Sequence, residues 1–180
     1  MDNGASSYRR FLSGDKSAIE ELITEYSDAL VLFTYCIVGD YACAEDIAAD
    51  TFATLIIKRK EFKDKAKFKT YLYKIARNKA IDRLRRMKHE VREDDLENLL
   101  TGDTERDLFE RETRRQLYVC MQKLPVEYKD VLCLTYFDGF SVKEVCAVMQ
   151  KTAKQVYNLL ARAKLTLRKF LDEVGINENL

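Results

Sequence analysis

The sequence predicts an all-α protein made of two small helical domains. Its 180 residues include one proline and six glycines, and 47% of them are hydrophobic and 34% charged. Alanine, leucine, lysine and glutamate are abundant and favour helices, whereas proline and glycine interrupt them. Apolar residues recur three and four positions apart along most of the chain, and no stretch alternates apolar and polar residues over the length of a strand.

Charge is sorted into blocks, although the whole chain carries a net charge of only +1. The net charges of the main blocks are −7 for residues 1–50, +11 for 51–88, −7 for 89–110 and +6 for 151–170. Two basic blocks separated by an acidic one predict two contacts with nucleic acid and an acidic tether between them. We therefore expect one domain at residues 1–88, a linker at 89–106 and a second domain at 107–180.

Two helices are expected before residue 60. Residues 1–12 are expected to fray, with docking of Tyr8, Phe11 and Leu12 as the alternative. Asp15 is the expected N-cap of the first helix, and Gly39 ends it. Asp40 then caps a second, amphipathic helix. Three carboxylates near the start of this helix form an acidic ridge: Glu45, Asp46 and Asp50. The acidic ridge either stabilises its own helix through the dipole or provides a docking surface for a basic partner.

A third helix is predicted over residues 67–86, with one packing face and one polar face. Phe68, Leu72 and Ala76 belong to the apolar face. The polar side carries cations and an amide: Lys74, Arg77, Asn78 and Arg85. Cations position phosphates, and asparagine and arginine can read base edges. A solvated face rich in lysine and arginine is the alternative interpretation.

The segment between the second and third helices is also basic. Residues 58–69 hold six lysines and one arginine, among them Lys63 and Lys65, with Phe62 and Phe68 between them. Such a segment suits single-stranded DNA, because bases stack on aromatic rings while lysines hold the backbone. The alternative is that the two rings are hydrophobic anchors that fix the segment, which we expect of Phe68.

The sequence of the second domain predicts a helix-turn-helix. After a helix that begins near Thr104, Pro125 fits the first turn of the next helix. Two capping boxes follow, Ser141 with Glu144 and Thr152 with Gln155. They delimit a short helix at 141–148, a tight turn at 149–151 and a long helix at 152–171. The long helix is basic, as expected for an element that enters the major groove, whereas an ordinary helical hairpin is the alternative.

Composition argues against an enzyme, a metalloprotein and a membrane protein. Five cysteines without a C-x-x-C pair, and His89 as the single histidine, provide no catalytic or metal-binding constellation and imply no cofactor. We expect buried thiols in a reducing, cytoplasmic compartment. There is no signal-peptide pattern, and the longest uncharged run, residues 29–39, is too short to cross a bilayer.

Two blocks of the sequence match a known family. The first consists of AEDIAADTFATL (44–55) and KFKTYLYKIARNKAIDRLRR (67–86), and the second is the segment 124–171, which contains the helix-turn-helix. Together they resemble a bacterial RNA polymerase sigma factor of the small two-domain, extracytoplasmic-function type, group IV of the sigma-70 family. The resemblance implies a sigma domain 2-like three-helix bundle and a sigma domain 4-like helix-turn-helix joined by the acidic linker.

The resemblance also implies roles for residues. The acidic ridge of Glu45, Asp46 and Asp50 would bind core polymerase. The melted "minus ten" promoter element would be held by Lys63, Lys65, Lys74, Arg77, Asn78 and Arg85, with Asn78 as the base reader. The duplex "minus thirty-five" element would be read by Lys154, Gln155, Tyr157, Asn158 and Arg162. The resemblance also implies an anti-sigma factor as a further partner, and the free protein is expected to be a monomer.

The sequence departs from the family pattern at several positions. Tyr71 stands where tryptophan is usual, and Gln150 stands where the turn usually has glycine. Tyr157 and Leu159 replace two usual cations, which implies an atypical promoter sequence. The rival hypothesis is a stand-alone, dimeric helix-turn-helix regulator, which leaves the basic segment and the acidic ridge without a role.

Overall fold

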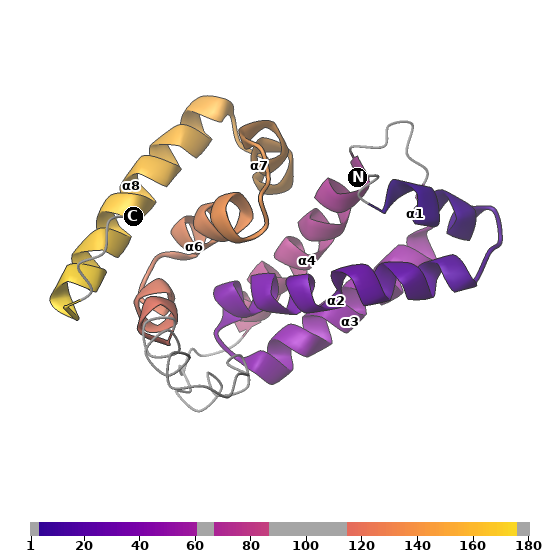
Figure 1. Cartoon of the computed structure of the whole chain (residues 1–180), viewed down its shortest axis with the longest axis horizontal. Coiled ribbons are helices and arrows are strands. Elements are labelled where there is room, and N and C mark those ends of the chain that lie inside the picture. The colour runs from indigo at the N-terminus through magenta and orange to yellow at the C-terminus, as the bar shows by residue number, and fades with distance from the viewer. Residues whose placement is uncertain (1–3, 61–66, 87–114, 176–180) are drawn as a thin grey trace, which may run out of the picture.

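The computed structural model describes residues 4–60, 67–86 and 115–175 (Figure 1). Within these ranges the chain forms helices and no strand, which confirms the all-α prediction. The helices are α1 (Ala5–Leu12), α2 (Ser17–Val38), α3 (Tyr41–Lys58), α4 (Lys67–Arg86), α6 (Val126–Leu132), the π-helical turn η2 (Cys133–Phe137), α7 (Val142–Met149) and α8 (Ala153–Glu173). Residues 115–122 are helical as well.

The first domain is a bundle of α2, α3 and α4 with α1 packed against α2 and α4. The prediction of a frayed N-terminus is wrong for α1, because Tyr8 and Phe11 are buried and tie this helix to the bundle. The rings of Tyr8 and Phe68 lie 4.9 Å apart, so Phe68 is a hydrophobic anchor as predicted. None of the helices in the described part of the chain is long and apolar enough to cross a membrane.

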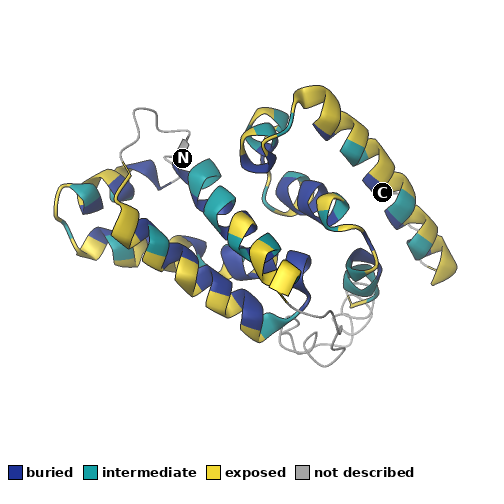
Figure 2. Cartoon of the chain, turned by 180° about the vertical axis from the view of Figure 1, so that it is seen from behind, coloured by how far each residue is buried: buried dark blue, intermediate teal, exposed yellow. Residues whose placement is uncertain are grey.

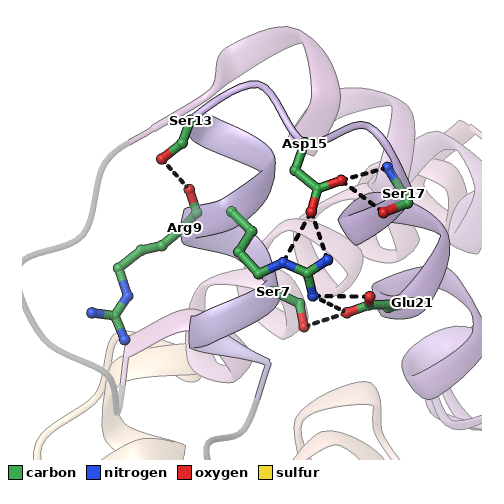
Figure 3. A network of polar contacts seen from close by, with 7 residues as sticks. Ser7, Arg9, Ser13, Asp15, Ser17 and Glu21 are labelled. Atoms are coloured by element: carbon green, nitrogen blue, oxygen red, sulfur yellow. Dashed lines mark hydrogen bonds and ion pairs between the residues drawn. The ribbon is translucent and has the colours of Figure 1, made fainter.

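The corner between α1 and α2 is held by polar contacts rather than by a simple cap (Figure 3). The predicted N-cap, Asp15, lies two residues before α2 begins, and its carboxylate accepts hydrogen bonds from the backbone N–H and the hydroxyl of Ser17. The other oxygen of Asp15 pairs with Arg10 at 2.6 Å, and Arg10 also pairs with Glu21 at 2.9 Å. These contacts fix α1 at the start of α2.

The other predicted helix ends are confirmed. Gly39 ends α2 with a φ of 74°, and the carboxylate of Asp40 accepts a hydrogen bond from the Cys43 N–H at 2.6 Å. Both capping boxes are formed, at Ser141 before α7 and at Thr152 before α8. The turn between these helices places Gln150 at a φ of 56°, in the left-handed region that glycine adopts more readily.

The predicted helix after Pro125 is not regular throughout. It ends at Leu132, and a π-helical turn, η2, continues to Phe137. The wider turn leaves the Tyr136 and Phe137 side chains exposed while Leu134 stays buried. Local propensity does not distinguish such a turn from an α-helix, so the sequence could not reveal it.

The two domains pack against each other, with α4 against α7 and the end of α2 against α6 and η2. Every residue from Phe33 to Gly39 is buried, because the end of α2 is covered by both domains. This explains the C-terminal part of the uncharged run, residues 33–39, since a helix that is apolar all round is a buried one. By contrast, α8 exposes much of its surface to solvent (Figure 2).

Candidate nucleic-acid interface

The acidic ridge lies on the solvent side of α3. Glu45, Asp46 and Asp50 are all exposed, as their predicted role in docking requires. Asp50 lies 3.6 Å from Lys79 of α4, and the two helices border a polar groove of about 440 Å³. Arg83 and Arg86 line the other side of this groove, so the ridge is flanked by cations of α4.

On α4 the predicted DNA-binding residues divide into two groups. Asn78 and Arg85 are exposed and Lys74 is half-buried, so these three side chains are accessible to a ligand. Arg77, by contrast, is only 9% exposed. The expectation that Arg77 lies on an open polar face is therefore wrong for this arrangement of the domains.

Arg77 points into the second domain and pairs with Asp130 of α6. Its Nε atom lies 2.8 Å from Oδ2 of Asp130, whose side chain is completely buried. Burial raises the pKa of Asp130 to about 6, against the opposing attraction of Arg77. No donor among the described residues hydrogen-bonds the other carboxylate oxygen, Oδ1.

A second carboxylate, that of Asp138 directly after η2, contacts the N-terminal half of α4. Its Oδ1 atom accepts a hydrogen bond from the Tyr73 hydroxyl at 2.5 Å, and its carbonyl oxygen accepts one from Lys69 at 2.7 Å. Burial raises the pKa of Asp138 to about 6, and Tyr73 and Lys69 oppose this shift. The ring of Phe140 covers the same place, 4.8 Å from the Tyr73 ring and 4.4 Å from the Lys69 ammonium.

Sequence reasoning did not identify Lys69, Tyr73, Asp130 and Asp138 as interacting residues. Lys69, Tyr73 and Arg77 are spaced by four, which aligns them along one stripe of α4 that is distinct from the apolar face. That spacing is the signal that was available. Their partners, however, lie more than 50 residues away, and no local pattern links them.

The end of α2 is capped by the second domain. The last carbonyl groups of a helix lack partners within the helix and form the negative end of its dipole. The Gln122 amide donates to the carbonyl oxygen of Cys36 at 3.3 Å, and the Lys129 ammonium donates to that of Ile37 at 3.1 Å. Lys129 also donates to Gln122 Oε1 at 2.8 Å, and burial lowers its pKa.

The predicted recognition helix, α8, presents its candidate residues to solvent. All five of them are exposed: Lys154, Gln155, Tyr157, Asn158 and Arg162. Val156 and Ala163 are buried and Leu160 is half-buried, so the opposite side of α8 packs against the domain. The side-chain oxygen of Gln155 is engaged in the capping box with Thr152, so only its NH₂ group is left to contact a base.

A second, apolar groove was not predicted. It has a volume of about 420 Å³ and lies between the helix at 115–122, η2 and α8, with Leu117, Met121 and Phe137 among its lining residues. Lys164 and Arg168 form its basic edge. The only sign of this groove in the sequence was the pair of adjacent aromatic residues, Tyr136 and Phe137, before the Asp138-Gly139 turn.

The cysteines have no metal-binding arrangement in the described part of the chain. Four are buried and Cys146 is half-buried, and all five are free thiols. Burial raises the pKa of the Cys133 thiol on η2 well above its ordinary value, and the neighbouring Cys36 of α2, across the domain boundary, adds to this shift. The predictions that concern Lys63, Lys65, His89 and the linker at 89–106 lie outside the described residues.

Comparison with known families matches both domains. Residues 9–90 match Sigma-70 region 2, and residues 114–167 match Sigma-70, region 4. The chain belongs to the sigma-70 family. Members of this family bind RNA polymerase and direct it to promoters, and this chain is such a sigma factor; a stand-alone regulator would not account for region 2.

Relatives place this sigma factor in the extracytoplasmic-function (ECF) group. The ECF RNA polymerase sigma factor SigW of Bacillus subtilis (strain 168) is 27% identical over 173 residues, which covers 89% of this chain and 92% of SigW. Two solved structures share the fold. CnrH, in complex with the cytosolic domain of CnrY, has a TM-score of 0.72 at 23% identity and covers 95% of this chain and 98% of that one.

The second structure is the sigma factor RpoE in complex with the anti-sigma factor NepR from Bartonella quintana. It has a TM-score of 0.66 at 17% identity and covers 85% of this chain and 96% of that one. At these identities the two structures establish only that the chains share a fold of two helical domains.

Proposed function

We propose that this sigma factor docks on core polymerase through the acidic ridge of α3, holds the melted minus-ten element with α4 and reads the minus-thirty-five element with α8. The observation that carries the proposal is the presence of two basic helices in separate domains, each with an exposed row of polar side chains, together with an exposed acidic helix. Each surface lies within the matching sigma-70 region.

The chemistry of α4 suits a single strand of DNA. Asn78 presents an amide that can pair with a base edge, and Arg85 presents a cation that can hold a phosphate. A base that is removed from the stack costs a few kcal/mol, so the contacts along α4 have to compensate for it. These contacts stabilise the melted promoter without any catalytic group.

The chemistry of α8 suits the major groove of duplex DNA. Lys154 and Arg162 would hold phosphates or guanine, while Asn158 and the NH₂ group of Gln155 would contact base edges. Tyr157, which is 60% exposed, offers an apolar surface where the family usually has a cation. This difference supports a promoter sequence that is unlike the common one.

Further partners follow from the relatives. CnrH and RpoE were each solved with a bound protein, which in the case of RpoE is an anti-sigma factor. We infer that this chain, a monomer in the cytoplasm when free, is also held by an anti-sigma factor. It needs no cofactor or metal and catalyses no reaction of its own.

Run-off transcription tests the proposal. Purified core polymerase is supplied with genomic fragments, with and without this protein, and new transcripts with discrete starts are expected only in its presence. The double variant Asn78→Ala, Arg85→Ala should lose at least about tenfold of this signal, since each contact is worth about 1–3 kcal/mol. The control Lys16→Ala, an exposed cation at the start of α2, should keep full activity. Equal activity of the double variant and the control would refute the role of α4.

A further inference from the structure

The stripe of α4 that faces the second domain has the composition of a DNA-binding surface. Lys69 and Arg77 are cations, and Tyr73 is an aromatic residue between them. Lysine, arginine and aromatic rings are the groups that hold single-stranded nucleic acid. In this structure, however, Tyr73 and Arg77 are buried, and the groups that satisfy all three residues come from α6 and the segment after η2.

We propose that Asp130 and Asp138 form an autoinhibitory latch, which occupies the Lys69–Tyr73–Arg77 stripe of α4 in the closed protein and has to release it before promoter DNA can bind there. This inference rests on the proposed function of α4. It makes domain closure and DNA binding mutually exclusive, because both use the same face of one helix.

The latch resembles DNA in its chemistry. The Asp130 carboxylate lies 2.8 Å from the Arg77 guanidinium, as a phosphate oxygen would. The Asp138 carboxylate and carbonyl group engage Tyr73 and Lys69 at 2.5 and 2.7 Å. The ring of Phe140 packs edge-on against the Tyr73 ring, with the centroids 4.8 Å apart and the planes at 66°, and so covers the ring that a base would contact. Each group on α4 thus has a substitute for its DNA partner.

The latch is also weak enough to open. A buried ion pair loses much of its attraction to the cost of removing both charges from water. That cost is high at Asp130, because its Oδ1 atom has no hydrogen-bond donor among the described residues. Opening would hydrate this oxygen, and DNA phosphates would then balance the positive charge of Arg77. The closed state is therefore poised to exchange one anion for another.

The two domains are aligned by a second contact, at the end of α2. Gln122 and Lys129 donate to the carbonyl groups of Cys36 and Ile37, which would otherwise lack partners. Gly39 allows this approach, since a Cβ atom there would lie 3.0 Å from Gln122 Oε1. This contact places Asp130, which follows Lys129 directly, opposite Arg77.

Opening should increase the apparent affinity for DNA. If only the open fraction binds, the measured dissociation constant equals the intrinsic one divided by that fraction. The substitution Asp138→Ala removes the side-chain oxygen that accepts the hydrogen bond of Tyr73, and the double variant Asp130→Ala, Asp138→Ala also removes the acceptor for Arg77. Glu127→Ala is the matched control, because Glu127 is an acid on α6 that pairs with Lys151 of the same domain.

Two measurements on the full chain test the latch. Small-angle X-ray scattering gives the radius of gyration, and fluorescence anisotropy gives the affinity for a labelled single-stranded 15-nucleotide oligonucleotide of mixed sequence. We expect a larger radius of gyration for the double variant and a roughly fivefold or greater gain in affinity, with a smaller change for Asp138→Ala and none for Glu127→Ala. Thermal melting by circular dichroism establishes that each variant is folded, and Asp138→Ala provides the test if the double variant is not.

Three results would overturn the inference. A folded variant with unchanged size and affinity would mean that the carboxylates do not hold the domains. A variant that opens without a gain in affinity would mean that the latch does not cover the DNA-binding face. If neither protein binds the oligonucleotide, the role of α4 in DNA binding fails, whereas the scattering still decides whether the carboxylates hold the domains together.

Discussion

At the scale of single residues, Gly39 illustrates how one position serves both a helix end and a domain contact. Its φ of 74° is in the left-handed region, and its missing side chain leaves room for Gln122. Gly139 has a similar φ of 65°, but nothing lies within 4 Å of the place where its Cβ atom would be. A comparison of substitutions at the two glycines therefore distinguishes the effect of backbone strain from the effect of the contact with Gln122.

We expect Gly39→Ala to lower the free energy of unfolding by about 1–2 kcal/mol, because alanine is strained at positive φ and would also displace Gln122. Gly139→Ala, which suffers the backbone strain alone, should cost less. Urea denaturation followed by circular dichroism measures both. Equal losses would show that Gln122 makes no useful contact at Gly39.

The titration of Asp138 and Asp130 gives the domain contact a defined pH dependence. Burial raises the pKa of each to about 6 from an ordinary value of 3.8. Asp138 faces Tyr73 and Lys69, and Asp130 faces Arg77, with Glu127 and Lys129 of its own helix nearby. In this window the closed state holds protons that the open state releases, so closure gains stability as the pH falls below 6 and loses it as the pH rises.

Scattering at about pH 5 and about pH 7.5 should accordingly give a smaller radius of gyration at the lower pH. The double variant Asp130→Ala, Asp138→Ala should show no such difference, because neither alanine titrates. A protein that expands on acidification within this window, while it keeps its helical circular dichroism, would contradict the prediction.

At the scale of elements, the helix ends are the part of the fold that the sequence predicts best. Asp40, Ser141 and Thr152 cap their helices as expected, because a cap depends on residues three positions away. The π-turn η2 and the ordered helix α1 could not be predicted. They depend on packing against residues far along the chain, such as Phe68 beneath Tyr8.

The capping box of α8 should matter for both stability and recognition. Thr152→Ala removes the hydroxyl that accepts from the Gln155 N–H, and we expect a loss of about 0.5–2 kcal/mol in the free energy of unfolding. It also removes one of the two hydrogen bonds that position the Gln155 side-chain oxygen, while the one from the backbone N–H of residue 152 remains, so binding to a minus-thirty-five duplex should weaken. Thr166→Ala is the control, because that hydroxyl only bonds a carbonyl group of its own helix. Unfolding curves that coincide for the two variants would refute the contribution of the cap.

The candidate sites were predictable to the extent that they are local. Exposure of the acidic ridge and of the α8 residues follows from helical periodicity. The burial of Arg77 does not, because its partner Asp130 is 53 positions away and belongs to another domain. A sequence pattern shows that a helix has a cationic stripe, but the tertiary structure decides which cations are covered.

At the scale of the whole molecule, the chain offers its own means to trap the closed state. Cys36 of α2 and Cys133 of η2 are neighbours across the domain boundary. We expect diamide to oxidise them to a disulfide, with two electrons and two protons passing to diamide to form its hydrazine. The reaction should be slow, because burial raises the pKa of Cys133 and the thiolate is the reactive form.

Mass spectrometry of a tryptic digest detects the linked peptides, and oligonucleotide binding should disappear in the linked protein and return with dithiothreitol. Cys36→Ser, which cannot form the link, should be insensitive to diamide. Linked protein that binds DNA as well as the reduced form would refute the latch. Absence of the link would refute the contact between the two thiols.

The central claim is that one face of α4 contacts the second domain in the free protein and promoter DNA in the initiation complex. A photoreactive amino acid in place of Lys69 tests this most directly, because its cross-link reports the neighbour in each state. We predict a cross-link to the segment around Asp138 in the free protein and to the non-template strand of the minus-ten element in the complex with core polymerase. A cross-link that stays on the second domain in a complex that produces transcripts would contradict the claim.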